Sequence, residues 1–297
     1  MTEPASPPAA TAPPARPPRP AELEDWLNGR IYHPLAWRLA RRLTQTRITP
    51  NMVSAAGAAA IMLAAAAYGM LAWPWGVALG LALHMGWHVL DGADGDLARL
   101  TERSSPHGEL VDGICDYAGH IVLYVTLGYF AAQQIGPMGW ALMWMAGASR
   151  VVQAAHYEGA RRQYQLAVYG TPWMASAPPP PGRDGRRHPF VAYYLWLTGW
   201  IVPYSAAFAA SVADPQRREL LREEMRDRGV ELLGRMSLLS ANYRTLAVGA
   251  AMLAGRPQWY FLFEIVVLGG VLLASLARVR RVLGAVLDHV SEASTRR

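Results

Sequence analysis

Four aspartates lie in two chain segments that are otherwise apolar enough to cross a membrane. Asp91 and Asp94 lie in the first segment, and Asp112 and Asp116 lie in the second. Side chains three or four positions apart share one face of a helix, so each pair of carboxylates lies on one face. A charge at the centre of a membrane helix costs about 3 kcal/mol, so four carboxylates need compensation. The pattern predicts a helical membrane protein with a buried acidic site.

The two acidic segments are predicted to run antiparallel, with residues 99–107 as the turn. A rise of about 1.5 Å per residue then places Asp91 and Asp116 at one depth, roughly 10 to 12 Å from the turn. Asp94 and Asp112 form a shallower pair. Oxygen ligands suit Mg²⁺ or Mn²⁺, and clustered carboxylates can hold two ions about 3.5 to 4 Å apart, as in phosphoryl displacement. We therefore expect a two-metal site.

Small residues accompany the aspartates. Gly95 and Ala98 follow the first pair, and Gly108 precedes the second pair. Without bulky side chains, these positions leave the backbone open to close approach by a phosphate or a sugar. Arg99, at the end of the first segment, can bind a phosphate through its planar guanidinium. The composition of this region indicates a phosphorylated substrate.

The complete pattern is Asp91-x2-Asp94-Gly95-x2-Ala98-Arg99, then eight residues, then Gly108-x3-Asp112-x3-Asp116. It resembles the full signature of the CDP-alcohol phosphatidyltransferase family (class I), and every fixed position matches. The resemblance implies a six-helix membrane enzyme, usually a homodimer. Such an enzyme transfers a substituted phosphate group from a CDP-linked donor, typically CDP-diacylglycerol, to an alcohol hydroxyl and releases CMP.

The resemblance also implies roles for residues at matching motif positions. Asp91, Asp94 and Asp112 would be metal ligands, and Asp116 would be both a ligand and the base that takes the hydroxyl proton. The residues that would contact or lie near the CDP moiety are Gly95, Ala98, Arg99, Ser105 and Gly108, together with Thr49, Pro50, Asn51 and Met52. The Thr-Pro-Asn sequence at 49–51 also resembles the start of the family's first membrane helix.

Composition excludes several other classes of protein. Half of the 297 residues are hydrophobic, so the chain is not a soluble globule. The net charge is +6, but the arginines lie mainly at helix ends and in connecting segments. That distribution fits anionic lipid and topology signals, and we predict no nucleic-acid partner. Cys115 is the single cysteine, which excludes a disulfide framework and a zinc cluster.

The N-terminal part is predicted to lie outside the membrane core. Residues 1–21 contain eight prolines and few bulky apolar side chains, which favours a disordered tail. Residues 22–48 predict an amphipathic helix, because Leu35, Leu39 and Leu43 share one side and Arg38, Arg41 and Arg42 occupy another. We interpret this helix as interfacial, on the anionic cytoplasmic leaflet; the alternative is a helix packed on protein.

Residues 49–281 are predicted to form a domain of six membrane helices, at about 51–73, 76–99, 108–133, 139–163, 238–255 and 258–277. Residues 164–237 form a cytoplasmic or interfacial insert, with a linker at 171–189, a weakly defined apolar segment at 190–210 and a charged helix at 215–235. Residues 282–297 form a polar amphipathic tail. Arginines are scarce in the turns near 74, 136 and 256, so we expect both termini and the acidic site on the cytoplasmic side of a bacterial inner membrane.

Several polar residues in the spans leave alternatives open. His84, His88, His107 and His120 are expected to pack or support rather than bind metal, Asp96 to be solvated, and Glu264 to make a polar contact between helices or in the outer leaflet. Arg150 and Arg244 either pair with carboxylates or bind a phosphate-bearing acceptor, such as glycerol phosphate or inositol phosphate; we adopt the second hypothesis. The rival functions are the same chemistry on soluble CDP-polyols or polyol phosphates, and a cation-coupled transporter.

Overall fold

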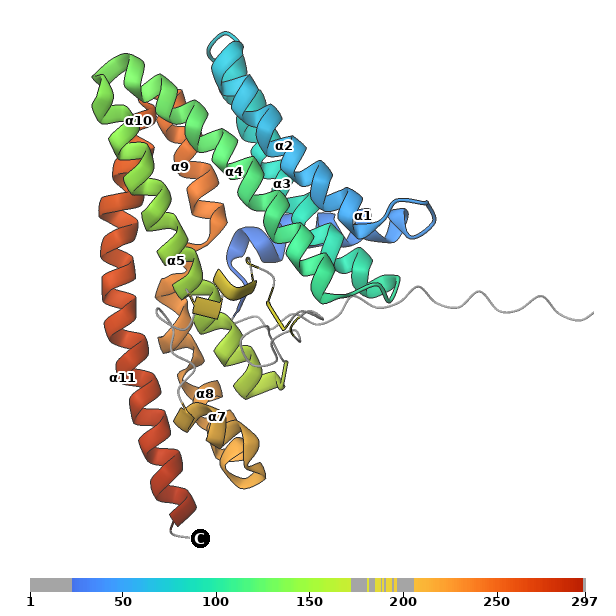
Figure 1. The fold of residues 1–297 in the computed structure, drawn as a ribbon, viewed down its shortest axis with the longest axis vertical. Helices are drawn as coiled ribbons and strands as arrows, with labels where there is room; N and C mark the ends of the chain where they lie inside the picture. The colour runs from blue at the N-terminus through green and yellow to red at the C-terminus, as the bar shows by residue number, and fades with distance from the viewer. Residues whose placement is uncertain are drawn as a thin grey trace, which may run out of the picture.

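The computed structural model describes residues 23–171, 181, 185–187, 189, 191–193, 195–196 and 206–295. All of its regular elements within these ranges are helices (Figure 1), as the sequence predicted. The predicted disordered tail at 1–21 lies outside the described residues. So do most of the predicted linker at 171–189 and half or more of the apolar segment at 190–210.

The acidic motif lies on α3 (Trp75–Leu100) and α4 (Pro106–Ile135), and both helices pack on α2 (Pro50–Met70). Thr49 caps α2, because its side chain accepts a hydrogen bond from the Met52 backbone N–H, and proline follows at the first helical position. Both α3 and α4 pack extensively on α2 and make few contacts with each other. The alanine- and glycine-rich sequence of α2 permits this close packing on two sides.

The N-terminal helix α1 (His33–Leu43) follows a π-helical turn at Asn28–Tyr32 and crosses the α2–α4 group (Figure 1). Ala36 and Ala40 are fully buried and pack with Ala93 and Leu97 of α3. The three arginines of α1 are exposed on the other side. One face of α1 therefore packs on protein, and the contact of its basic face with a membrane stays a prediction.

The other half of the helical core contains α5 (Pro137–Tyr169), α9 (Ala241–Leu253) and α10 (Pro257–Leu262). A π-helical turn at Phe263–Val267 joins α10 to the long α11 (Leu268–Thr295). Helices α5, α9 and α10 share one apolar core with α2, α3 and α4, in which Ile61, Leu127, Met143, Val248 and Phe261 are buried.

Within the part of the chain that the structure describes, three helical stretches are long and apolar enough to cross a membrane: Pro50–Met70, His107–Ile135 and Pro257–Ser294. Helices α3, α5 and α9 occupy the other three predicted positions. Of these, α9 has only 13 residues, which is about 20 Å against the roughly 30 Å of a hydrocarbon core. The membrane character of the chain therefore rests on three helices, and six spans stay a prediction.

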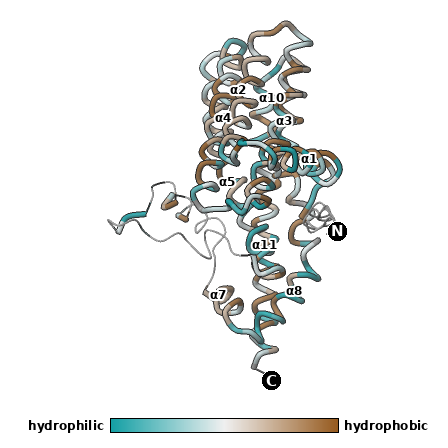
Figure 2. Tube along the Cα trace, turned by 90° about the vertical axis from the view of Figure 1, so that its right-hand side faces the viewer, coloured by the Kyte–Doolittle hydropathy of each residue, from teal (hydrophilic) through white to brown (hydrophobic). Residues whose placement is uncertain are grey.

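A second apolar core lies below the first in Figure 1, in a region that we call the helical extension. It consists of α7 (Ala206–Ala213), α8 (Pro215–Leu233), a 3-10 turn at Gly234–Leu239, the end of α5 and the second half of α11. It contains more hydrophilic residues along its chain than the upper part does (Figure 2). Leu221 and Met225 of α8 are buried there with Val282, Val286 and Val290 of α11. The segment 282–297 thus continues a packed helix, as far as Thr295, instead of leaving the fold as a polar tail.

Candidate active site

The α3–α4 connection brings the two acidic segments together. Helix α3 ends at Leu100 and α4 starts at Pro106, so the turn is close to the predicted one. Ser105 caps α4, because its Oγ accepts a hydrogen bond from the Gly108 backbone N–H at 3.1 Å. Because α3 and α4 pack on α2 and not on each other, side chains of both can enter the space between them.

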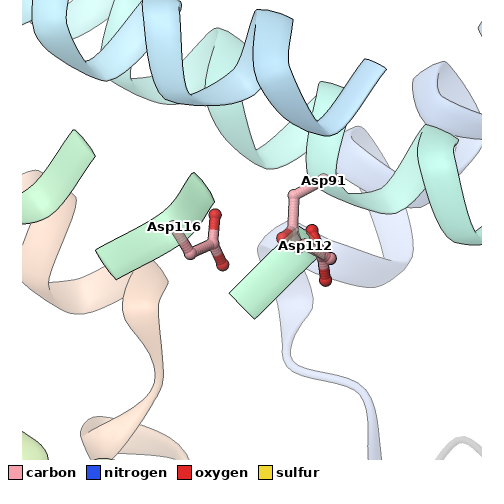
Figure 3. A group of neighbouring side chains, drawn as sticks. All are labelled: Asp91, Asp112 and Asp116. Carbon is pink, nitrogen blue, oxygen red and sulfur yellow. The ribbon is translucent and has the colours of Figure 1, made fainter. Parts of the chain in front are cut away.

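Three carboxylates meet in that space. Asp91, Asp112 and Asp116 each offer one oxygen, and these oxygens lie within 4.8 Å of one another (Figure 3). Asp91 comes from α3, and the other two come from α4. Side-chain contacts also join Asp91 to Asp116 and Asp94 to Asp112, which are the two pairs of equal depth.

Asp94 lies outside this three-member cluster and is held by α2. Its Oδ2 accepts a hydrogen bond of 2.6 Å from the Ser54 hydroxyl, and both side chains are buried. Since Asp94 also contacts Asp112, it stays adjacent to the cluster. The fourth motif carboxylate therefore belongs to the same site.

Asp116 receives a hydrogen bond from a tryptophan of α3. The Trp87 indole N–H donates to Asp116 Oδ1 at 2.8 Å, and Trp87 is buried. His120, one helical turn after Asp116, uses its Nδ1–H to donate to the Asp116 backbone carbonyl at 2.8 Å. The carboxylate and its backbone are thus both fixed.

The buried histidines next to the site connect helices. Hydrogen bonds join the Thr245 hydroxyl of α9 to His88 Nε2 at 2.9 Å and to His84 Nε2 at 3.2 Å. The rings of His84 and His120 also approach each other, with centroids 5.9 Å apart. These contacts are those of packing and supporting residues. Within the described residues, the cluster that could hold a metal ion contains only aspartates.

The donor set fits a divalent cation. Among the residues that the structure describes, no arginine or histidine forms an ion pair with Asp91, Asp94, Asp112 or Asp116. Clustered carboxylates without a cation repel one another strongly in a poorly solvated site. Their all-oxygen donors match the preference of hard ions such as Mg²⁺ and Mn²⁺.

The carboxylates line a cavity of about 840 Å³. Its walls come from the N-terminal segment, α3, α4, α5 and the start of α9, and include Glu24, Asn28, His33, His88, Gly95, Arg99, His120, Tyr124, Arg150, Tyr157 and Arg244. Such a volume accommodates a substrate of the size of a nucleotide together with a small second substrate.

A comparison with protein families agrees with this geometry. The family model for CDP-alcohol phosphatidyltransferase matches residues 47–213, more than half of the chain. The chain belongs to the CDP-alcohol phosphatidyltransferase family. No curated protein matches its sequence. Family membership makes the chain a transferase of a phosphate group from a CDP-alcohol to an alcohol, in a family that generally depends on divalent metals.

Some of the residues of this phosphatidyltransferase expected near CDP line the cavity, and the others lie at nearby helix ends. Gly95 and Arg99 line the cavity. The others lie at the starts of α2 and α4 or, for Ala98, in the last turn of α3: Thr49, Pro50, Asn51, Met52, Ala98, Ser105 and Gly108. The two helix starts are adjacent, since a β-carbon built on Gly108 would lie 3.9 Å from Asn51 Oδ1.

Asp96 is not the solvated residue that the sequence suggested. Its side chain is 3% exposed and forms an ion pair with Arg99, whose own side chain is 52% exposed. Helical geometry directs Asp96 away from Asp94, but its side chain is buried and lines the cavity. Asp96 therefore holds Arg99 at the edge of the cavity.

The two arginines of the acceptor hypothesis have different surroundings. Arg244 is buried: its Nε donates to Glu264 Oε1 at 3.0 Å, and its other nitrogens donate to Gln153 and to the Leu239 carbonyl. Glu264 thus makes a contact between helices. Arg150 lies over the Tyr124 ring, 5.8 Å from its centroid, and forms no ion pair with a described carboxylate. Both line the cavity, and neither pairs with the aspartates.

Sequence reasoning did not identify Ser54, Trp87 and Thr245 as residues of the site. Ser54 is four residues after Pro50, and Trp87 is four residues before Asp91 on the same helix face. That spacing was the available signal, but a serine or a tryptophan in an apolar helix is usually a packing residue. Their hydrogen-bond partners come from other helices, and only the folded structure identifies them.

Proposed function

We propose that this transferase is a metal-dependent membrane enzyme of phospholipid biosynthesis. It moves a phosphatidyl group from CDP-diacylglycerol to the hydroxyl of an alcohol and releases CMP. The observation that carries the proposal is the cluster of Asp91, Asp112 and Asp116 oxygens within 4.8 Å of one another, on the family motif and inside a large cavity. The chain has apolar helices that suit a membrane, and one of them, His107–Ile135, lines the cavity, which suits a lipid donor.

Asp91, Asp94, Asp112 and Asp116 would hold two divalent cations, Mg²⁺ or Mn²⁺. Bound there, the cations would neutralise the diphosphate of the donor and the leaving CMP. Asp116 takes the proton of the acceptor hydroxyl while the oxygen of that hydroxyl attacks the phosphorus of the phosphatidyl group. A new oxygen–phosphorus bond forms, and the phosphoanhydride bond to CMP breaks. The side-chain contact between Asp91 and Asp116 supports this assignment, because a metal ligand and the base would then be neighbours.

The nucleotide is assigned to the mouth of the cavity. Arg99 binds phosphate there, and Gly95, Ala98 and Gly108 allow the nucleotide to approach the backbone. Ser105 and residues 49–52 complete this assignment. It is supported by the position of Arg99 at the cavity edge and by the adjacent starts of α2 and α4.

The acceptor is assigned to the far wall, at Arg150 and Arg244, and is anionic and phosphate-bearing. Arg150 supports this assignment because its guanidinium lines the cavity without an ion pair to a described carboxylate. Arg244 contributes through the same wall, while Glu264 keeps it in place. Arg150→Ala should raise the KM of the acceptor and leave the KM of the donor unchanged. A change in the donor's KM alone would contradict the assignment.

The enzyme is further assigned to the bacterial inner membrane, as a homodimer with cytoplasmic termini and active site. A cysteine at Gln134 provides the topology test, in a variant in which Cys115 is replaced by serine. Gln134 is at the end of α4 away from the aspartates, where its side chain donates to the Gly255 carbonyl. A membrane-impermeant thiol reagent should label it in intact cells. Labelling that requires lysis would reverse the orientation.

The central experiment is an activity assay on the purified protein. Radiolabelled CDP-diacylglycerol and soluble CDP-polyols are each incubated with Mg²⁺ and a panel of free and phosphorylated alcohols, and the products are identified. Release of CMP with a labelled phospholipid product supports the proposal. Turnover of soluble donors alone would select the polyol alternative. Ion uptake into proteoliposomes without any CMP release would select a transporter.

A further inference from the structure

Trp87 is a neutral hydrogen-bond donor on the carboxylate assigned as the base. Its indole N–H reaches from α3 to Asp116 Oδ1 on α4, at 2.8 Å. The side chain is 4% exposed, so water does not compete effectively for this bond. A hydrogen bond to a carboxylate in such a poorly solvated place is stronger than one at the surface.

The indole ring is itself held by neighbours on several sides. Its centroid lies 4.4 Å from that of His88 and 4.7 Å from that of His120, and the His120 ring meets it edge-on. On α2, Gly57 provides room for the ring, because a β-carbon there would lie 3.3 Å from Trp87 Cδ1. The direction of the N–H bond is therefore set by packing.

An uncharged donor has a specific advantage here. A lysine or arginine on Asp116 would neutralise the carboxylate and compete with a divalent cation for it. An indole N–H fixes one oxygen, Oδ1, and leaves the negative charge in place. The other oxygen, Oδ2, is not engaged by the indole, and Asp116 lines the cavity.

We propose that Trp87 is a positioning residue for Asp116: its N–H holds Oδ1, so that Oδ2 faces the acceptor hydroxyl. The kinetic role rests on the proposed function, whereas the hydrogen bond itself does not. The two parts are therefore tested separately, by spectroscopy and by kinetics.

The first test observes the indole N–H in detergent micelles, without any substrate. The protein contains eleven tryptophans, and the ¹⁵N-indole signal of Trp87 is assigned as the one missing in Trp87→Phe. Asp116→Ala should shift this signal strongly, and Asp214→Ala, in the helical extension, should leave it unchanged. An unshifted signal in Asp116→Ala would overturn the proposal, whether or not the protein proves to be a phosphatidyltransferase.

The second test compares two Trp→Phe variants. Trp87→Phe keeps an aromatic ring but removes the donor, and should lower kcat roughly tenfold to a hundredfold with the KM of the CDP donor nearly unchanged. Trp73→Phe is the matched control, because the Trp73 indole donates to the Leu253 carbonyl at 3.2 Å, at the end of the molecule away from the aspartates. Trp73→Phe should leave kcat unchanged.

A variant with benzothienylalanine at position 87 covers the case in which Trp87→Phe fails to fold. Sulfur replaces the N–H in this residue, so shape is retained and only the donor is lost. It should reproduce the loss in kcat at an unchanged melting temperature. Wild-type kcat in this variant, or an equal change in kcat and in the donor's KM, would overturn the positioning role. Activity absent from the wild-type protein itself would instead reject the proposed function.

Discussion

The region around the aspartates and the helical extension are stabilised in different ways. Around the aspartates, buried polar contacts join neighbouring helices: Ser54 to Asp94, Trp87 to Asp116, and Thr245 to two histidines. In the extension, aliphatic side chains of α8 and α11 pack together, and the polar residues form ion pairs near the surface. The region around the aspartates is less stable because it holds like charges together. The helical extension adds stability to the fold through its apolar packing.

The comparison predicts that substitutions in the two regions have opposite effects. A change at the aspartates should remove activity with little cost in stability. A change in the core of the extension should lower stability with little effect on the chemistry of the folded protein. Asp112→Asn and Leu221→Ala test this expectation directly. Arg244→Ala tests a buried ion pair outside both sets, and Arg99→Ala tests the nucleotide assignment. The four variants are ordered here from the largest expected effect to the smallest.

Asp112→Asn should reduce CMP release to the detection limit, because it removes a ligand shared by the carboxylate cluster. In metal-free buffer its melting temperature should stay the same or rise, since one of several neighbouring like charges is gone. Activity is measured at saturating Mg²⁺, and unfolding is followed by a thermal scan. Full activity of this variant would remove Asp112 from the metal site.

Arg244→Ala should destabilise the protein by about 3 to 5 kcal/mol, because it leaves Glu264 buried without its charge partner. The double variant Arg244→Met/Glu264→Gln is the control and should recover much of the loss, since it removes both charges. Unfolding free energy is measured by denaturant titration in detergent. A single variant as stable as the wild type would show that the pair does not matter for the fold.

Leu221→Ala should lower the unfolding free energy by about 2 to 5 kcal/mol, because it creates a cavity in the core of the extension. Below its melting temperature, kcat per folded molecule should match the wild type. Glu223→Ala, on the exposed side of α8, is the matched control. A large loss of kcat in folded Leu221→Ala would show that the extension takes part in catalysis.

Arg99→Ala should weaken donor binding by roughly 1.5 to 3 kcal/mol, the range for a hydrogen bond to a charged group. The binding of a non-hydrolysable CDP donor is measured by titration. Arg103→Ala is the control, because Arg103 is an exposed arginine in the α3–α4 turn, four residues after Arg99. Equal donor affinity in the two variants would assign the nucleotide elsewhere.

The same contrast explains what the sequence could predict. Asp91, Asp94, Asp112 and Asp116 were identifiable because a carboxylate in an apolar helix is costly, and few arrangements compensate for it. The helices that carry them, α3 and α4, follow from continuous apolar sequence on either side of the predicted turn. Both are local or energetically extreme signals.

Other features depend on partners distant in sequence. Trp87 and Ser54 are ordinary residues of apolar helices until Asp116 and Asp94 lie beside them. Leu221 and Val286 are likewise apolar residues of charged amphipathic helices, which many packing arrangements could bury. Helical periodicity predicted that α8 exists, but it did not show that α11 covers it. Asp96 was misjudged because its neighbours, and not its direction on the helix, determine its burial.

The length of α11 decides where the chain can be shortened. Residue 281 looks like a natural end, because the last apolar stretch and its arginines finish there. Yet α11 continues through three valines, 282, 286 and 290, whose side chains are nearly or fully inaccessible. Ending the protein at 281 would remove the part of α11 that packs with Leu221 and Met225, and α8 would keep mainly its contacts with α5, α7 and the 3-10 turn. A shortened protein for crystallography therefore has to keep the helix through Val290. In the full chain, an affinity tag belongs after Thr295.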